Sequence, residues 1–94
     1  MATPWTVKIP APVQREIDRL PNRVRTEIRD ILLDLMDDPY LPDALELRKN
    51  PGMFRIRLYD NAYRLLYSIN PKRRLVVLFR ARTRSDAYDG LRNP

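Results

Sequence analysis

The stretch from Phe54 to Arg82 constrains the fold most, because apolar and polar side chains alternate along it at the period of a β-strand. Its first run reads Phe-Arg-Ile-Arg-Leu, and two further β-favouring runs follow. The turn residues Asp60-Asn61 and Asn70-Pro71 separate the runs, so neighbouring strands are expected to pair antiparallel. The predicted strands are Phe54–Leu58, Tyr63–Ile69 and Arg74–Arg82.

The chain before this stretch has a different organisation. Trp5–Ile9 alternates like a strand, and Ala11–Leu20 has the apolar spacing of a helix, with a proline after each. Asn22 is expected to cap a second helix, which two aspartates and Pro39 end. The apolar stripe of that helix consists of Val24, Ile28, Ile31, Leu32 and Leu35. The two helices are expected to form an antiparallel hairpin.

The remaining segments complete a prediction of the fold class. Residues 39–53 contain three prolines and one glycine, which indicates an irregular connection. Near the end, Ser85 is expected to cap a short last helix containing Tyr88 and Leu91. We therefore predict one small α+β domain over residues 1–94, in which the helical hairpin packs on a curved, mainly antiparallel four-stranded sheet.

Cysteine and histidine are both absent from the sequence. Their absence removes thiolate nucleophiles, disulfides, the commonest metal ligand and the usual proton shuttle. The carboxylates are scattered along the first half, so we predict neither a metal site nor a cofactor. No apolar run approaches the roughly 20 residues that cross a bilayer, and no charged leader is evident, so we expect a cytoplasmic protein without a membrane partner.

Charge is divided unequally along the chain. Residues 1–47 contain 6 basic and 9 acidic side chains, whereas residues 48–94 contain 12 basic and 3 acidic ones. A basic surface concentrated in one region suits a polyanion such as a nucleic acid. The alternative is a soluble basic protein with a solvated face.

Arginines are expected on one face of the predicted meander. Arg55 and Arg57 leave the first strand on the same side, roughly 7 Å apart. Arg64 lies early in the second strand and Arg82 near the end of the third. Acidic neighbours are scarce, which favours a phosphodiester held by guanidinium groups. The alternative is that strand arginines only discourage edge aggregation, and we prefer it for Arg73 and Arg80.

Five aromatic residues are interleaved with these arginines, as is typical where RNA bases stack on a protein. Tyr63, Tyr67 and Phe79 lie within predicted strands, where packing in the core is the usual role. Tyr88 follows a polar stretch and is therefore the best candidate for a contact with a base or a phosphate.

Three segments form a set: Phe54-Arg-Ile-Arg-Leu58, Tyr63-Arg-Leu-Leu-Tyr67 and Arg82-Thr-Arg-Ser-Asp-Ala-Tyr88. Together they resemble the RelE/ParE superfamily of bacterial toxins. The order of strand, helical hairpin, meander and terminal helix is also that of the family, so the resemblance covers most of the chain. Leu47-Arg48 resembles a further family element, Leu-Arg/Lys-Gly, although Lys49 stands where glycine is usual.

The resemblance implies a RelE-like microbial RNase fold and one of two activities. RelE-like members cleave mRNA on the ribosome, whereas ParE-like members inhibit DNA gyrase without nuclease chemistry. This chain fills the RelE-like cationic positions and the tyrosine position, which favours a metal-independent mRNA endoribonuclease that inhibits translation. The matched catalytic residues are Arg55, Arg57, Arg64, Arg82 and Tyr88. The expected RNA-binding residues are Arg48, Lys49 and Arg84.

In the implied reaction, a ribose 2′-hydroxyl attacks the adjacent phosphate and expels the 5′-oxygen. The arginines of the first two meander strands would position and neutralise the phosphate, Arg82 would stabilise the leaving oxygen, and Tyr88 would orient the base or sugar. Close relatives often carry lysine at the two first-strand positions, whereas arginine stays protonated and is a poor base. Two residues are candidates for the general base. Tyr88 could serve if the arginines favour its ionised form, and Glu46 comes from the connecting region that supplies a carboxylate in some relatives.

The partners implied by the resemblance are an acidic cognate antitoxin, mRNA on the ribosome, and ribosomal RNA. Arginines of the helical hairpin are candidates for contacts with ribosomal RNA, although we prefer solvated side chains for most of them: Arg15, Arg19, Arg23, Arg25 and Arg29. A small nucleic-acid-binding module is a third interpretation, but the chain lacks a recognition-helix pattern and an RNA-binding aromatic motif.

Overall fold

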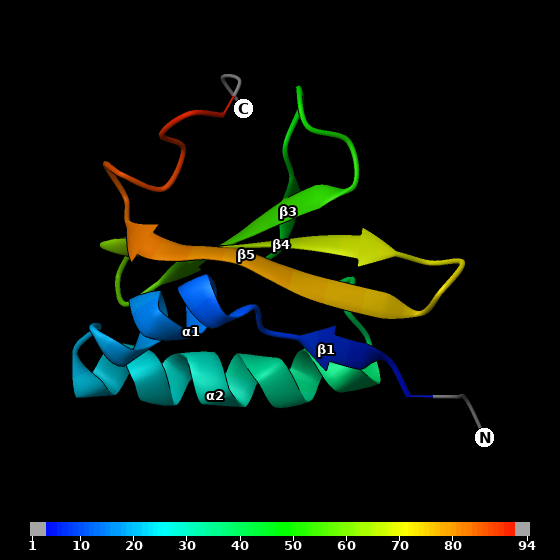
Figure 1. Cartoon of the computed structure of the whole chain (residues 1–94), viewed down its shortest axis with the longest axis horizontal. Coiled ribbons are helices and arrows are strands. Elements are labelled where there is room, and N and C mark those ends of the chain that lie inside the picture. The colour runs from blue at the N-terminus through cyan, green and yellow to red at the C-terminus, as the bar shows by residue number, and fades with distance from the viewer. Residues whose placement is uncertain (1–3, 92–94) are drawn as a thin grey trace.

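Residues 4–91 are described by a computed structural model, shown in Figure 1. The predicted domain, residues 1–94, extends past the described residues at both ends. The helices are α1 (Ala11–Asp18) and α2 (Asn22–Asp37). The strands are β1 (Thr6–Lys8), β2 (Leu45–Glu46), β3 (Met53–Leu58), β4 (Tyr63–Asn70) and β5 (Leu75–Thr83).

These strands form one sheet in the order β1-β5-β4-β3-β2. β3, β4 and β5 are the predicted antiparallel meander, β2 pairs antiparallel with β3, and β1 runs parallel to β5. Both helices cover one face of the sheet, while the C-terminal segment and the connection before β3 rise from the other face (Figure 1). The predicted α+β class, with a helical hairpin on a mainly antiparallel sheet, is confirmed.

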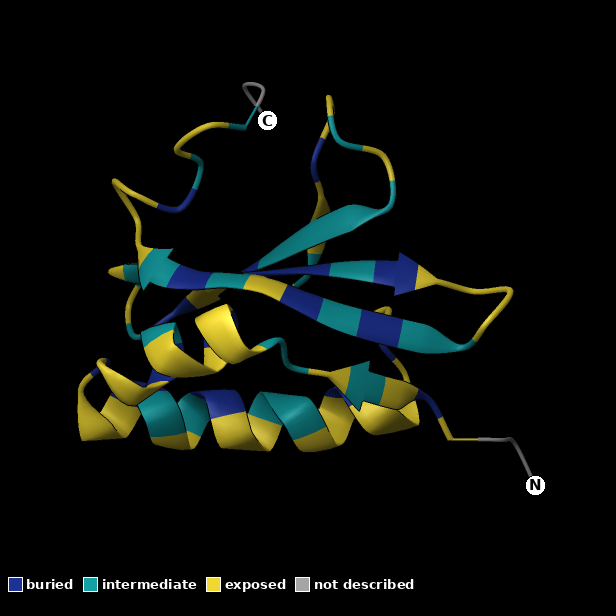
Figure 2. Cartoon of the chain, viewed as in Figure 1, coloured by how far each residue is buried: buried dark blue, intermediate teal, exposed yellow. Residues whose placement is uncertain are grey.

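The core lies between the helices and the sheet. Val24, Ile28 and Leu35 of α2 are buried, as their spacing predicts. Leu65 and Tyr67 of β4 are buried on the face of the sheet that packs against the helices. In Figure 2 the outward sides of both helices are mostly exposed. Burying one such side chain contributes about 1.5 to 3 kcal/mol, so this contact fixes the hairpin on the sheet.

The turn predicted at Asp60-Asn61 is confirmed and uses left-handed backbone. Tyr59, Asp60 and Asn61 have φ angles of 45°, 52° and 73°. Asp and Asn tolerate this region better than most residues do. The Tyr59 amide donates a hydrogen bond to Oε2 of Glu27 at 2.9 Å, which ties the turn to α2.

The capping role predicted for Asn22 is wrong. Pro21 is the N-cap residue of α2, no side chain caps this end, and Asn22 is the first helical residue. The Asn22 amide oxygen instead accepts a hydrogen bond from Nη2 of Arg25 at 3.2 Å. Proline fixes its own φ near the value needed just before a helix, so the start of α2 needs no side-chain acceptor.

The connection after α2 contains a strand that the sequence pattern did not predict. Leu45 and Glu46 pair with Arg55 and Phe54 at the edge of the sheet, which makes β2 a fifth strand. Both residues are exposed and the strand is only two residues long, so no alternation identifies it.

The short helix predicted after Ser85 does not form. Residues 84–90 are consecutive turns, in which the Ala87 amide donates to the Thr83 carbonyl at 3.0 Å. The Ser85 hydroxyl lies 3.3 Å from the Thr83 hydroxyl, and Gly90 has a φ of 77°. That left-handed glycine interrupts any helix in this short segment.

A β-bulge in β5 sets the direction of the side chains that follow it. Leu66 pairs with Arg80 whereas Tyr67 pairs with Leu78, so Phe79 is the extra residue. One extra residue reverses the strand alternation, which turns the arginines after the bulge away from the helices. Phe79 is 40% exposed, so its predicted role in the core is wrong.

Tyr67 is fully buried, and its hydroxyl donates a hydrogen bond to the Pro39 carbonyl oxygen at 3.1 Å. Burial raises the pKa of Tyr67, so the folded protein keeps a neutral phenol where the unfolded chain ionises. We therefore expect the free energy of unfolding to fall above about pH 10, by up to roughly 1.4 kcal/mol per pH unit from this residue.

The variant Tyr67→Phe should lack that pH-dependent component. At pH 8 its free energy of unfolding should be about 1 to 3 kcal/mol lower than that of the wild type, because the Pro39 carbonyl loses its donor. Urea denaturation of both proteins at pH 8 and pH 11 measures both effects. An equal loss of stability in the two proteins between these pH values would contradict the assignment.

Candidate nucleic-acid interface

Two rows of side chains cross the sheet on the face opposite the helices. Arg57 pairs with Arg64, and Arg64 pairs with Arg82, across β3, β4 and β5. Directly paired residues share a face with Cβ atoms about 4.5 to 5.5 Å apart, so three guanidinium stems start side by side. The adjacent row holds Arg55, Leu66 and Arg80. We name as the arginine face the surface bearing Arg55, Arg57, Arg64, Arg80 and Arg82.

Arg55 and Arg57 lie on the β2 side of the arginine face, where both line a hollow of about 360 Å³ with residues 42–45. Burial lowers the pKa of Arg55, and the neighbouring charges of Arg57 and, more weakly, Arg64 lower it further. Tyr88 acts on this pKa in the opposite direction. The structure therefore brings these four side chains within electrostatic reach of one another.

Arg64 is buried, with only 6% of its surface exposed. Its Nη1 donates hydrogen bonds to the carbonyl oxygens of Asn61 at 3.0 Å and Tyr63 at 3.3 Å. Its Nε is buried without a hydrogen-bond partner. Arg64 thus holds the β3–β4 turn and adds positive charge beneath the arginine face, whereas Arg57 in the same row is exposed.

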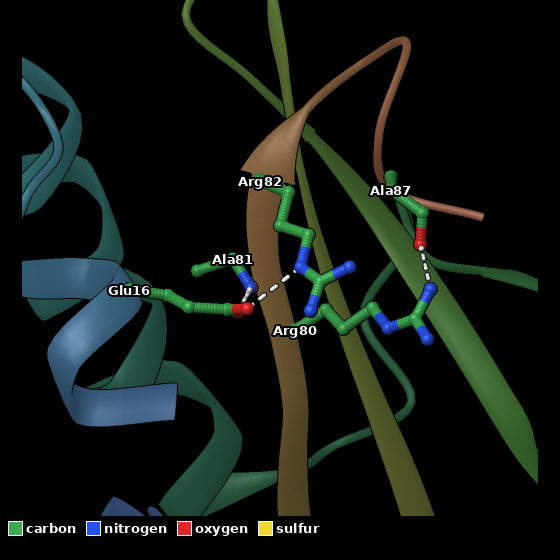
Figure 3. A network of polar contacts seen from close by, with 5 residues as sticks. All are labelled: Glu16, Arg80, Ala81, Arg82 and Ala87. Atoms are coloured by element: carbon green, nitrogen blue, oxygen red, sulfur yellow. Dashed lines mark hydrogen bonds and ion pairs between the residues drawn. The ribbon is translucent and has the colours of Figure 1, made fainter. Parts of the chain in front are cut away.

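Arg82 is bound by Glu16 of α1, as Figure 3 shows. Its Nε lies 2.6 Å from Oε2 of Glu16, and Oε1 of the same carboxylate accepts the Ala81 amide at 2.9 Å. This ion pair joins α1 to β5. Arg82 and Glu16 also line a hollow with Asp86 and Asp89, which is separate from the hollow beside β2.

Arg80 belongs to the arginine face, although its sequence context favoured an ordinary surface residue. Its Nη1 donates a hydrogen bond to the Ala87 carbonyl at 3.0 Å, so it ties the C-terminal segment to β5 (Figure 3). Burial lowers the pKa of Arg80 and Arg82 lowers it further, while two acidic neighbours oppose them. Residues two positions apart on a strand share a face, so the spacing of Arg80 and Arg82 in the sequence indicated that both belong to the arginine face.

A second, smaller core brings Tyr88 to the arginine face. Leu66 lies between Arg55 and Arg80 in its row and is fully buried there. Tyr88 packs against the cluster that Leu66 belongs to. The buried members of this cluster are Leu47, Leu66 and Ala87.

The predicted RNA-binding residues lie in the two segments that rise from the arginine face. Arg48 and Lys49 are exposed in the turn after β2, and Arg84 is exposed just after β5. The Arg84 amide donates to the Ala62 carbonyl at 3.0 Å, which fixes the start of the C-terminal segment. All three residues are exposed to solvent.

Glu46 does not join the arginine face. It pairs with Phe54, the neighbour of Arg55 along β3, so its side chain starts from the opposite face of the sheet. Its Oε2 accepts the Gly52 amide hydrogen bond at 2.9 Å. The structure therefore separates this candidate base from the cations.

Two arginines of the helical hairpin have structural partners. Arg23 donates to the Tyr59 hydroxyl at 2.5 Å and lies 4.9 Å from the centre of its ring. Arg25 donates to the Leu20 carbonyl at 2.9 Å, in the connection between the two helices. The exposed members of the set are Arg15, Arg19, Arg23 and Arg29.

Glu16 is the residue of this region that sequence reasoning missed. Val13 and Ile17 are the buried positions of its helix, and Glu16 lies half-buried beside them. A half-buried carboxylate requires a partner, but the spacing along α1 does not reveal that the partner is on β5.

Within residues 4–91, no helix is long and apolar enough to cross a membrane. The same residues contain no group of three acidic, histidine or cysteine side chains placed to hold a metal ion.

No protein-family model matches the chain, and a search of curated proteins finds no match. Solved structures do match. A chain of the toxin–antitoxin complex RelBE2 from Mycobacterium tuberculosis is 31% identical, with a TM-score of 0.71 over 86% of this chain and 99% of that one. The isolated RelE toxin of Escherichia coli is 20% identical, with a TM-score of 0.73 over 84% of this chain and 83% of that one. A chain of the RelE–RelB complex from Pyrococcus horikoshii is 27% identical, with a TM-score of 0.59 over 92% of this chain and 100% of that one.

Proposed function

This chain belongs to the RelE-like toxin superfamily, and from that premise we propose that it is the toxin of a type II toxin–antitoxin system. The similar structure from Mycobacterium tuberculosis is a toxin–antitoxin complex, and that from Pyrococcus horikoshii is a RelE–RelB complex, which supports a cognate antitoxin as the partner of this chain. Residues 48–94 carry 12 basic and 3 acidic side chains, so an antitoxin segment rich in acidic residues would complement them.

The proposed activity is ribosome-dependent cleavage of mRNA, which would inhibit translation in the cytoplasm. The arginine face is the observation that carries this proposal. Five arginine side chains start from one sheet face, and Tyr88 packs on the cluster of Leu66, which lies between Arg55 and Arg80 on that face. Like charges held directly opposite each other destabilise a sheet, so a polyanionic ligand such as RNA is the natural partner for this arrangement.

In the proposed reaction the 2′-oxygen bonds to phosphorus while the bond from phosphorus to the 5′-oxygen breaks. The products are a 2′,3′-cyclic phosphate and a 5′-hydroxyl end. Arg55 and Arg57 would hold the phosphate oxygens, with Arg64 contributing its charge from below. Arg82 would stabilise the negative charge that develops on the leaving oxygen.

Two protons must also move in this reaction, one from the 2′-hydroxyl and one to the 5′-oxygen. Arginine remains protonated at neutral pH and is therefore a poor proton acceptor. Tyr88 is our candidate for assisting proton transfer and for orienting the base or sugar, since Glu46 lies on the other face of the sheet. No residue proposed for these steps needs a metal ion.

Contacts outside the reacting phosphate would come from the exposed cations around the arginine face. We propose that these cations bind the phosphates of the mRNA strand and of ribosomal RNA. These residues are Arg48, Lys49 and Arg84.

Removing one exposed arginine should change the salt dependence of RNA binding. For Arg57→Ala, the slope of log affinity against log salt concentration should decrease in magnitude by about 0.7, the value for one phosphate contact on a single strand. Titration of a short fluorescent RNA at several salt concentrations measures this slope. Arg73→Ala removes an equal charge from the β4–β5 turn and should leave the slope unchanged.

Purified toxin and ribosomes programmed with a defined mRNA provide the direct test of the reaction. Cleavage should require the ribosome and should leave a cyclic phosphate on one fragment and a 5′-hydroxyl on the other. Intact mRNA in the presence of folded toxin, or fragments with 5′-phosphate ends, would contradict the proposal.

A further inference from the structure

We infer that Glu16 is a positioning residue for Arg82, a role that rests on the proposed nuclease function. Glu16 contributes no atom to the reacting phosphate. It acts by fixing the guanidinium that would face the leaving oxygen, and it does so from α1, which is otherwise a structural element of the core.

The carboxylate of Glu16 uses both of its oxygens. Oε1 accepts the Ala81 amide at 2.9 Å, and Oε2 accepts Nε of the next residue, Arg82, at 2.6 Å (Figure 3). One bond fixes the backbone of β5 and the other fixes the side chain that leaves it. The pair of bonds therefore defines both the origin and the direction of the Arg82 side chain.

The neighbours of Arg82 explain why its side chain needs the hydrogen bond to Glu16 to stay in place. In its row it lies directly opposite Arg64, whose like charge repels it. On its other side, Asp86 and Asp89 line the same hollow and offer competing carboxylates. Glu16 lines that hollow as well, and it is the carboxylate that the structure places in contact with the Arg82 guanidinium.

Glu16 binds Nε of Arg82, and this choice of atom suits a residue that positions the guanidinium. Arginine has five N–H donors, and Nε is the one nearest the chain. Binding at Nε leaves the two terminal amino groups able to donate to a phosphate in the paired geometry that guanidinium favours. A carboxylate bound to the terminal groups would instead compete with the ligand.

The first test does not depend on catalysis. In the NMR spectrum of the full chain, the Nε–H proton of Arg82, identified by its loss in Arg82→Ala, should exchange slowly with water. Glu16→Gln offers one acceptor oxygen in place of two, so this exchange should become about tenfold faster or more. Equal exchange rates in the two proteins would overturn the inference, whether or not the protein cleaves RNA.

The matched control is Glu27→Gln. Glu27 is also a helix carboxylate that accepts a backbone amide, that of Tyr59 at 2.9 Å. Within residues 4–91, Nε of Arg82 donates its hydrogen bond to Glu16 and not to Glu27, so the substitution of Glu27 should leave the Arg82 signal unchanged.

The second test asks whether Glu16 acts through Arg82. Glu16→Gln should lower kcat for ribosome-dependent cleavage by roughly 10- to 100-fold with little change in KM, because the loss is one of orientation. In an Arg82→Ala background, the same substitution should have almost no further effect. Equal effects in the two backgrounds would show that Glu16 acts independently of Arg82. A wild-type protein without cleavage would instead reject the proposed function and leave the NMR result to decide the inference.

Discussion

Cleavage of ribosome-bound mRNA should slow by about a hundredfold or more when Arg82 is replaced by alanine, because one donor to the developing oxyanion is lost. Stability should change little. Arg82 is 35% exposed and Glu16 is 21% exposed, so their ion pair contributes at most about 1 kcal/mol after solvent screening. Single-turnover cleavage and urea denaturation of the variant would measure both quantities.

The control for this variant is Arg73→Ala, which removes the same charge from an exposed position in the β4–β5 turn. It should cleave at nearly the wild-type rate. Equal loss of activity in the two variants would assign the effect to net charge, and full activity of Arg82→Ala would reject the role proposed for this residue.

Replacing Leu66 with alanine should cause the second large effect, on stability and activity together. Leu66 is fully buried in the small core beneath the C-terminal segment. Its truncation should lower the free energy of unfolding by about 2 to 5 kcal/mol. Because Tyr88 packs against this cluster, cleavage by the folded fraction should also fall, by roughly tenfold or more.

Leu65→Ala provides a matched comparison, since the two residues are adjacent on β4 and equally buried. Leu65 belongs to the main core under the helices, so its truncation should cost similar stability. Tyr88 does not pack against it directly, and cleavage by the folded fraction should be nearly unchanged. The same relative loss of cleavage in both variants would show that the small core does not position Tyr88.

The strands of the meander and both helices were predictable because each has one buried face. Ile56 and Leu58 alternate with Arg55 and Arg57 along β3, and the structure buries the first pair. This alternation also predicted the shared face of the arginines. A two-residue edge strand with both side chains exposed carries no such signal, which is why β2 was missed.

The bulge at Phe79 explains why the cationic face was only partly predictable. Before the bulge, Val76 and Leu78 face the core; after it, Ala81 does. The buried positions before and after Arg80 therefore follow two different alternations. Only the pairing of β5 with β4 shows which face of the sheet bears Arg80. Arg64 illustrates a further limit, since its spacing predicts the face but not its burial beneath the turn.

Contacts between distant elements were beyond the reach of sequence patterns. The Glu16–Arg82 pair joins residues 66 positions apart, and no local rule matches one carboxylate on α1 to one arginine on β5. The C-terminal segment is similar. Ser85 suggested a helix cap, but the packing of Ala87 and Tyr88 on Leu66 holds the segment as consecutive turns.

Mapping mRNA 5′ ends in bacteria after brief expression of the protein tests the central claim most directly. Primer extension should reveal cuts within translated codons for the wild type and few or none for Arg82→Ala at equal protein levels. A gyrase-cleavage assay on the same cells should be negative. Growth arrest with intact mRNA and trapped gyrase would contradict the nuclease and move the chain to the gyrase-inhibiting branch of the superfamily.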